Sequence, residues 1–257
     1  MPGQTSTDQT DTQARFPRRF TGQTILVTGA GTGFGAEIAV RAAQEGARVV
    51  VHYNRSREGA EQTAKRVEQA GSQAALVQAD ITSWDEIRAL ADAAFSAFGR
   101  LDVAVNNVGD VARDQMSWRD ITEESIDHVL AVDIKGTLLC TQEFGSRMVE
   151  AGGGCIINIG STVIVRGSAR APQYAAAFAP TVRVNTFAPG FIETQSTLNR
   201  KDWKSGRAET LRSLTPLGRI PKPAEVAGTA LFLATADASH MTGVYMVADG
   251  GFNMVGA

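Results

Sequence analysis

After residue 20, the chain alternates short apolar runs with longer helical stretches, and this alternation indicates how it folds. The runs are almost continuously apolar, which is typical of strands buried on both faces of a parallel sheet. No hairpin dipeptide separates consecutive runs, so helices connect them as right-handed crossovers. The predicted strands lie at 24–29, 47–53, 74–80, 101–109, 155–161, 182–190 and 243–251, and the predicted helices at 34–46, 56–71, 83–99, 122–153 and 223–239.

The sequence therefore predicts one α/β domain over residues 21–257, a Rossmann-like, doubly wound, seven-stranded parallel sheet with helices on both faces. Neither an internal repeat nor a linker divides it. Residues 1–20 are polar, and we expect them to form a disordered tail.

Helix-end signals support these boundaries. Ser56 and Ser83 are predicted N-caps, and Glu86 stands three residues after Ser83, as in a capping box. Gly71 suits the end of the second helix, and Pro223 suits a first helical turn.

Composition excludes several classes of protein. A net charge of −2 gives no reason to expect a nucleic acid or an anionic membrane as partner. No apolar run reaches the roughly 18 residues of a membrane span, and the polar N-terminus lacks the apolar core of a signal peptide. Two cysteines make no disulfide framework and favour a cytoplasmic protein. The three histidines lack ligand spacing, so we expect no metal site.

A glycine-rich loop, Thr28–Gly35, joins the first predicted strand to the first helix. This is where a Rossmann fold places a pyrophosphate on a helix N-terminus. Glycines let the backbone turn sharply and approach phosphates without a Cβ. The spacing is G-x-x-x-G-x-G, with Phe34 where G-x-G-x-x-G needs its third glycine. The loop and its context predict a dinucleotide site.

The end of the second strand bears on which dinucleotide binds. NAD sites place a carboxylate there, on the ribose 2′-hydroxyl. Here the chain reads His52, Tyr53, Asn54 and Arg55, without a negative charge. An arginine can take a 2′-phosphate bidentately, so the sequence favours NADP(H) over NAD(H). A pair of solvated loop arginines, Arg55 and Arg57, is an equally open interpretation of the same residues.

With these motifs in order, the chain after its tail resembles the short-chain dehydrogenase/reductase family. Thr28–Gly35 matches the family's T-G-x-x-x-G-x-G, Asp80–Ile81 the pair at the adenine, and "NNVG" at 106–109 its N-N-A-G. "INIGS" ends at Ser161, and Tyr174 follows thirteen residues later, the family's interval. "RVNTFAPGFIET" and the C-terminal "VADGG" also match, and "PGFIET" is similar to 3-oxoacyl-carrier-protein reductases.

The resemblance implies hydride transfer between NADP(H) and a small carbonyl compound or alcohol, in a homodimer or homotetramer. Ser161 would hydrogen-bond the substrate oxygen and Tyr174 would act as the acid–base. Asp133 occupies the place of a fourth family residue, an asparagine. The implied cofactor-binding residues are Gly29, Thr32, Gly33, Phe34, Gly35, Tyr53, Asn54, Arg55, Ser56, Asp80, Ile81, Asn107, Gly109, Tyr174, Pro189, Gly190, Ile192 and Thr194.

Two departures stand against the resemblance. The family's lysine, four residues after its tyrosine, lowers the tyrosine pKa and holds the ribose; here the position holds Phe178. Aspartate at 133 accepts hydrogen bonds but, unlike asparagine, donates one only when protonated.

The segment after Tyr174 is also short. Only seven residues precede Val182, where the family has a long helix. Seven residues span at most ~25 Å extended but rise only ~10 Å as a helix, less than the ~17–20 Å length of a strand. Three explanations are open: the native protein carries a helix and lysine that this sequence lacks, the protein is a cofactor-binding remnant, or a partner subunit covers the gap. Intact mass against 27.2 kDa separates the first from the others.

Two further alternatives stay open. The polar stretch Thr194–Pro216 follows the segment implied at the nicotinamide, and it is either a mobile substrate lid or an ordinary surface helix. The whole chain is either an oxidoreductase or a non-catalytic dinucleotide-binding protein.

Overall fold

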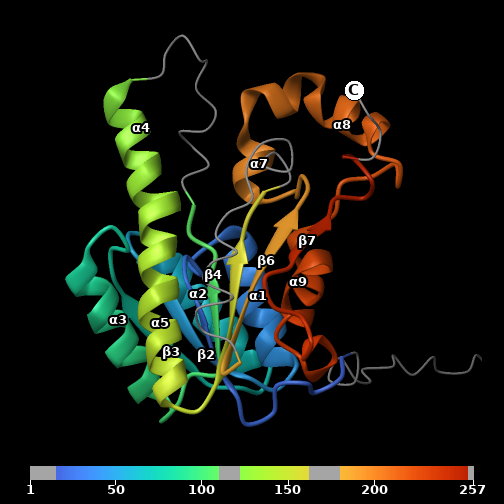
Figure 1. Cartoon of the computed structure of the whole chain (residues 1–257). Helices are drawn as coiled ribbons and strands as arrows, with labels where there is room; N and C mark the ends of the chain where they lie inside the picture. The colour runs from blue at the N-terminus through green and yellow to red at the C-terminus, as the bar shows by residue number, and fades with distance from the viewer. Residues whose placement is uncertain (1–15, 110–121, 162–179, 254–257) are drawn as a thin grey trace, which may run out of the picture.

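The computed structural model describes residues 16–109, 122–161 and 180–253. Seven parallel strands form one sheet in the order β3-β2-β1-β4-β5-β6-β7, which confirms the predicted doubly wound architecture (Figure 1). They are β1 (Thr24–Val27), β2 (Arg48–Tyr53), β3 (Ala74–Gln78), β4 (Val103–Asn106), β5 (Gly154–Ile159), β6 (Val182–Pro189) and β7 (Tyr245–Ala248).

The strand order reverses between β1 and β4, which are direct neighbours in the sheet. In doubly wound sheets, ligands bind beyond the carboxyl ends of the strands at this point. In Figure 1 these ends point to the top, toward α7 (Gln195–Asn199) and α8 (Ala208–Leu214).

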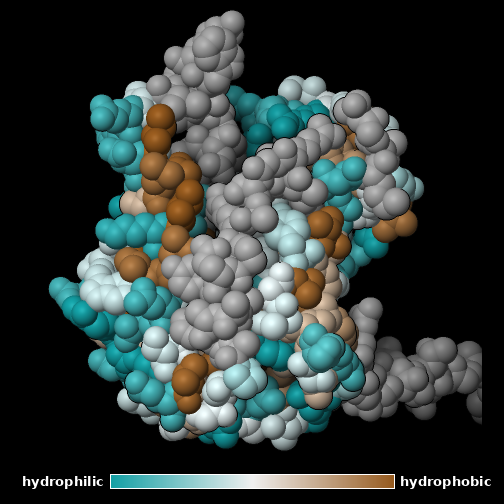
Figure 2. Space-filling model, viewed as in Figure 1, coloured by the Kyte–Doolittle hydropathy of each residue, from teal (hydrophilic) through white to brown (hydrophobic). Residues whose placement is uncertain are grey.

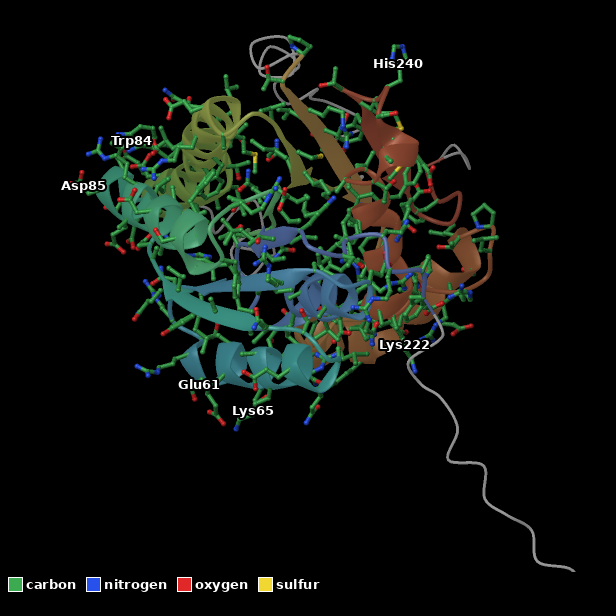
Figure 3. All side chains as sticks on the ribbon, turned by 90° about the horizontal axis from the view of Figure 1, so that it is seen from below. Glu61, Lys65, Trp84, Asp85, Lys222 and His240 are labelled. Atoms are coloured by element: carbon green, nitrogen blue, oxygen red, sulfur yellow. The ribbon has the colours of Figure 1, made fainter. Side chains whose placement is uncertain are left out.

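Helices cover both faces of the sheet, as predicted. One core holds α1 (Gly33–Gln44), α2 (Arg57–Gln69) and α9 (Pro223–Phe232) against the sheet, and a second core lies under α3 (Trp84–Ala97) and α5 (Thr137–Glu150). In Figure 3, Glu61 and Lys65 point from α2 away from the sheet, as its polar face should. Alternate strand residues enter the two cores, for example Ile25 in the first and Leu26 in the second.

The predicted helix at 122–153 is continuous but not uniform. It comprises α4 (Glu123–Val129), a π-helical segment η3 (Leu130–Gly136) and α5. A π-helical turn within an α-helix is frequently found at a functional site. The stretch after β6 contains α7, a second π-helical segment η5 (Trp203–Arg207), and α8, and a short 3₁₀ turn, η6 (Ala236–Ala238), follows α9.

The structure confirms some of the predicted helix-end signals fully and others only in part. Ser83 caps α3 by accepting from the Glu86 backbone N–H, but the Glu86 carboxylate accepts from Asp80 N at 2.7 Å instead of completing a capping box. Pro223 begins α9 as predicted. Ser56 is the N-cap residue of α2, as predicted, but its side chain accepts no capping hydrogen bond.

The packed domain begins before residue 21. Phe20, which the sequence analysis places in the tail, is fully buried in the first core. Beside it Arg19 pairs with Glu45 at the end of α1, and Arg41 binds the same carboxylate at 2.6 Å. Glu45 is completely inaccessible to solvent, so the two arginines neutralise a buried charge and fasten this segment to α1.

Candidate dinucleotide site and catalytic residues

The glycine loop leaves β1 at the switch point and enters α1 at Gly33. Gly29 (φ 65°) and Gly33 (φ 62°) adopt the left-handed conformation that favours glycine. A Cβ at Gly33 would meet nothing within 4 Å, so this turn faces open space. Thr32 makes no side-chain cap, and the first turn of α1 holds no acidic residue. The N-terminal amides of α1 are therefore suited to an anion such as a pyrophosphate.

The other loop glycines are required by packing. A Cβ at Gly31 would lie closer than 3.0 Å to Ser56, and one at Gly35 would lie equally close to Asn107. Phe34 packs instead against Phe187 of β6, with ring centroids 6.3 Å apart. The predicted loop residues are thus brought together with the chain that follows β2 and β4.

The end of β2 lies beside this loop. Tyr53 is buried, and the next residues come progressively to the surface, with Arg55 and Ser56 exposed. The serine hydroxyl stands against Gly31, next to the turn at Gly33. The structure therefore brings the predicted ribose-end residues and the predicted phosphate loop to one place.

Asp80 follows β3 at the same edge. Burial, the largest single effect, raises the pKa of its carboxyl, but hydrogen bonds from Thr82 and Asn54 and the charge of Arg55 together lower that pKa below its ordinary value. Asp80 is therefore a stable carboxylate held close to Asn54 and Arg55. Its neighbour Ile81 is buried and packs against Gly136 at the end of η3.

Asn107 ties the end of β4 to the end of β1. Its side chain donates to the Thr28 carbonyl at 3.0 Å, and its backbone N–H donates to the Thr28 hydroxyl at 2.9 Å. Asn106 points the other way, into a buried network with Thr141 and Asn158. These bonds fix the two strands that border the switch point.

Ser161 stands two residues beyond the carboxyl end of β5. Tyr245 of β7 donates its hydroxyl hydrogen to the Ser161 carbonyl at 2.7 Å and so holds the backbone of this residue. Tyr174 and Phe178 lie outside the described residues, so their predicted roles stay predictions.

Asp133 lies within η3, half-buried. A Cβ at Gly109 would stand 3.7 Å from one of its carboxylate oxygens, so Asp133 and Gly109 meet at the carboxyl end of β4. Lys135, two residues on, is exposed.

The segment implied at the nicotinamide follows β6. Pro189 and Ile192 are buried, and the Gly190 N–H donates to the Ala248 carbonyl at 3.0 Å. A Cβ at Gly190 would lie 2.7 Å from Asp249, so this approach also needs glycine. Thr194 caps α7 by accepting from Thr197 N at 3.1 Å.

The predicted lid, Thr194–Pro216, is helical over much of its length and has a small core of its own. Trp203, Leu211 and Ile220 are buried together, and Phe191 and Phe252 pack against them, with the two phenyl rings edge to face with each other. Its mobility stays a prediction.

A cavity of about 240 Å³ lies at the amino ends of the central strands, opposite the switch point. Arg100, Asp102 and Arg183 are among the residues that line it. It is therefore separate from the residues predicted for the dinucleotide. Among residues 16–109, 122–161 and 180–253, no group of three or more metal-ligating side chains is gathered. No helix in those ranges is long and apolar enough to span a membrane.

Comparison with known proteins agrees with this arrangement. A family model described as short chain dehydrogenase matches residues 23–205, and one described as enoyl-(acyl carrier protein) reductase matches residues 165–253. The chain belongs to the short-chain dehydrogenase/reductase family. Members of this family bind a nicotinamide dinucleotide.

Individual relatives span the full domain. D-threitol dehydrogenase of Mycolicibacterium smegmatis is 34% identical, over 93% of this chain and 96% of its own. The 3-oxoacyl-[acyl-carrier-protein] reductase of Thermotoga maritima is also 34% identical, over 91% and 98%. A solved 7α-hydroxysteroid dehydrogenase, complexed with NADH and 7-oxo glycochenodeoxycholic acid, is 30% identical with a TM-score of 0.81, over 91% of this chain and 95% of its own.

Two residues near the site were not singled out by sequence. Tyr245 offered no signal, since its contact with Ser161 crosses from β7 to β5. His52 was noted for carrying no negative charge and as one of three histidines without metal-ligand spacing. In the structure it is buried, and it contacts both the glycine loop and the end of β3. A polar residue at an otherwise apolar strand end is the signal that could have found it.

Proposed function

We propose that this protein is an NADP(H)-dependent oxidoreductase that transfers a hydride between nicotinamide and a small carbonyl compound or secondary alcohol. The observation that carries the cofactor preference is the end of β2, where Arg55 and Ser56 are exposed beside the open turn at Gly33. A guanidinium binds a phosphate bidentately, whereas a carboxylate at this place would repel it. One solved relative is complexed with NADH, so the preference for NADP(H) is tested below by direct measurement.

The chemistry assigned to the chain is proton transfer and orientation. When bound, the nicotinamide supplies or accepts the hydride. The Ser161 hydroxyl hydrogen-bonds the substrate oxygen, and Tyr174 gives its proton to that oxygen as a carbonyl is reduced. In the oxidation of an alcohol Tyr174 takes the proton back. Asp133 supports this site from the carboxyl end of β4.

With Phe178 in place of the family's lysine, that position does not supply Tyr174 with the cation that favours phenolate in the family. An unassisted tyrosine has a pKa of about 10. If Phe178 is native, alcohol oxidation therefore rises with pH up to about 10. An intact mass near 27.2 kDa would identify Phe178 as native, while an excess of well over a kilodalton would show that a helix is absent from this sequence.

The cofactor is tested by dissociation constants of NADPH and NADH from fluorescence titration. Arg55→Gln weakens NADPH by about 10- to 100-fold, the equivalent of a charged hydrogen bond, and changes NADH by less than about threefold. Arg57→Gln is the matched control, because Arg57 is exposed on α2 and pairs with Glu61 at 2.9 Å. Tighter binding of NADH by the wild type would refute the preference.

Turnover is tested with a panel of ketones and NADPH. Ser161→Ala lowers kcat by at least about 10²-fold, with the dinucleotide dissociation constant unchanged. Dinucleotide binding without turnover, in protein of verified mass, would instead indicate a non-catalytic binding protein.

We also propose that the protein forms a homodimer or homotetramer in the cytoplasm. Figure 2 shows apolar side chains gathered along α4 and its continuation, where Ile126 and Leu130 are 49% and 47% exposed. Burying such residues in a subunit contact would remove apolar surface from water. Cys140 and Cys155 are buried free thiols, which fits a reducing compartment. Sedimentation velocity tests the assembly, and a monomer at micromolar concentration would refute it.

A further inference from the structure

His52 is the last but one residue of β2, and its imidazole lies inside the protein with 1% of its surface exposed. One ring nitrogen, Nδ1, accepts a hydrogen bond from the Gly29 backbone N–H at 3.1 Å. The other, Nε2, lies 3.0 Å from the Ala79 carbonyl oxygen. Since a carbonyl only accepts, Nε2 carries the hydrogen and Nδ1 is left with its lone pair toward Gly29.

The backbone of the same residue reinforces the contact. The Ala30 N–H donates to the His52 carbonyl at 2.9 Å. His52 therefore holds two successive amides of the glycine loop, one through its carbonyl and one through its ring. Its ring simultaneously holds Ala79, the residue immediately before Asp80.

We propose that the His52 imidazole is a positioning residue for dinucleotide binding, which fixes the turn at Gly29 relative to the end of β2. The proposal rests on dinucleotide binding at this loop. The contact joins three segments assigned to the dinucleotide: the glycine loop, the end of β2 and Asp80. Gly29 is in the left-handed conformation, so a bond that fixes its N–H also fixes the direction in which the loop leaves β1.

The role requires a neutral ring. Burial lowers the pKa of His52 to about 4, although the Ala79 contact and the Asp80 charge act to raise it. Of the neighbouring segments, β1, the loop 28–35 and β3 carry no charged side chain. Among the described residues, Arg55 and Glu86 of α3 also bring charge to the end of β3: the charge of Arg55 acts on Asp80, and Glu86 accepts from the Asp80 N–H. Protonation would place a hydrogen on Nδ1, facing the Gly29 N–H, so that two donors would oppose each other.

Two substitutions separate this role from a structural one. In His52→Asn, the amide oxygen can take the place of Nδ1 and accept from Gly29. In His52→Gln, the longer amide can take the place of Nε2 and donate to Ala79 while leaving Gly29 without its acceptor. Each variant loses one of the two ring contacts, so we expect similar losses of melting temperature.

Binding is measured by calorimetry at pH 7.5 with NADPH and with ADP-ribose, which lacks the nicotinamide. His52→Gln raises both dissociation constants by about three- to tenfold, as expected for one hydrogen bond, and His52→Asn raises them by less than about twofold. Because the pKa of His52 is about 4, binding to the wild type should follow that to His52→Asn down to about pH 5 and should weaken more in the wild type only as the pH falls toward 4.

Equal dissociation constants for the two variants, or losses that only follow their melting temperatures, would overturn the proposal. If neither variant folds, hydrogen exchange of the Gly29 amide in the wild type decides: protection at pH 7 that weakens toward pH 4 supports the role, and an unprotected amide overturns it. A wild type that binds neither NADPH nor NADH would instead overturn the proposed function.

Discussion

Gly59, in the first turn of α2, lies close to the glycine loop. A Cβ at this position would lie closer than 3.0 Å to the Gly31 carbonyl oxygen and 3.1 Å from the Thr32 methyl. Ordinary contacts between such atoms are about 3.5 Å, so Gly59→Ala must push the loop and α2 apart by at least about 0.5 Å. The opposing atoms are backbone, which cannot rotate away.

The expected cost follows from two opposing effects. Overpacking of this kind costs about 1–3 kcal/mol, and alanine in a helix regains up to about 1 kcal/mol relative to glycine. We expect Gly59→Ala to lower the free energy of unfolding by about 1–2 kcal/mol. Because the displaced atoms belong to the loop, the NADPH dissociation constant should rise at least about fivefold.

Gly228→Ala in α9 is the matched control. Its Cβ would lie 2.9 Å from Arg41, but the contact is with the end of a flexible side chain. This variant should change stability by less than about 1 kcal/mol and leave NADPH binding unchanged. Urea unfolding and calorimetry give the two quantities. If Gly59→Ala matched Gly228→Ala in both, the close contact between α2 and the loop would be wrong.

Three further substitutions test the contacts that hold the site. Because the pKa of His52 falls from 6.5 unfolded to about 4 folded, its contribution to stability is complete above pH 6.5 and is lost as the pH falls toward 4; the free energy of unfolding should drop by about 3 kcal/mol more in the wild type than in His52→Asn. Glu45→Ala leaves the partly exposed Arg19 and Arg41 without their buried partner and should lower the free energy of unfolding in urea by about 2–4 kcal/mol. Glu45→Gln should lower it by less. Thr28→Val removes the acceptor of the Asn107 N–H and should cost about 1–3 kcal/mol in the same assay, while Thr28→Ser, which keeps the hydroxyl, should stay within about 1 kcal/mol of the wild type.

The strands and most helices could be predicted because their signals are local. A strand buried on both faces is almost continuously apolar, as in β1 and β2, and Gly46 and Gly71 end their helices in the left-handed conformation. The glycine loop was likewise predictable from its place between β1 and α1.

What failed depends on partners distant in sequence. Ser56 is a good N-cap residue by type, but its hydroxyl packs against Gly31, and this tertiary contact decides its direction. Phe20 follows a polar stretch, and only Glu45 and the first core show why it is buried. The contacts of His52 cross from β2 to β1 and β3, which no local pattern encodes.

The π-helical segment η3 has a consequence for insertions and deletions. A π-helical turn holds about one residue more than regular α-helical bonding needs. Deleting one residue between Leu130 and Gly136 would let α4 and α5 join as one regular helix. Because each helical residue corresponds to about 100° of rotation, the deletion would also rotate α4 by about 100° about the helix axis relative to α5. Asp133 would then leave the side of Gly109. The shortened chain would thus have a more regular helix but an altered site. The extra residue in η3 therefore serves the placement of Asp133 and not the stability of the helix.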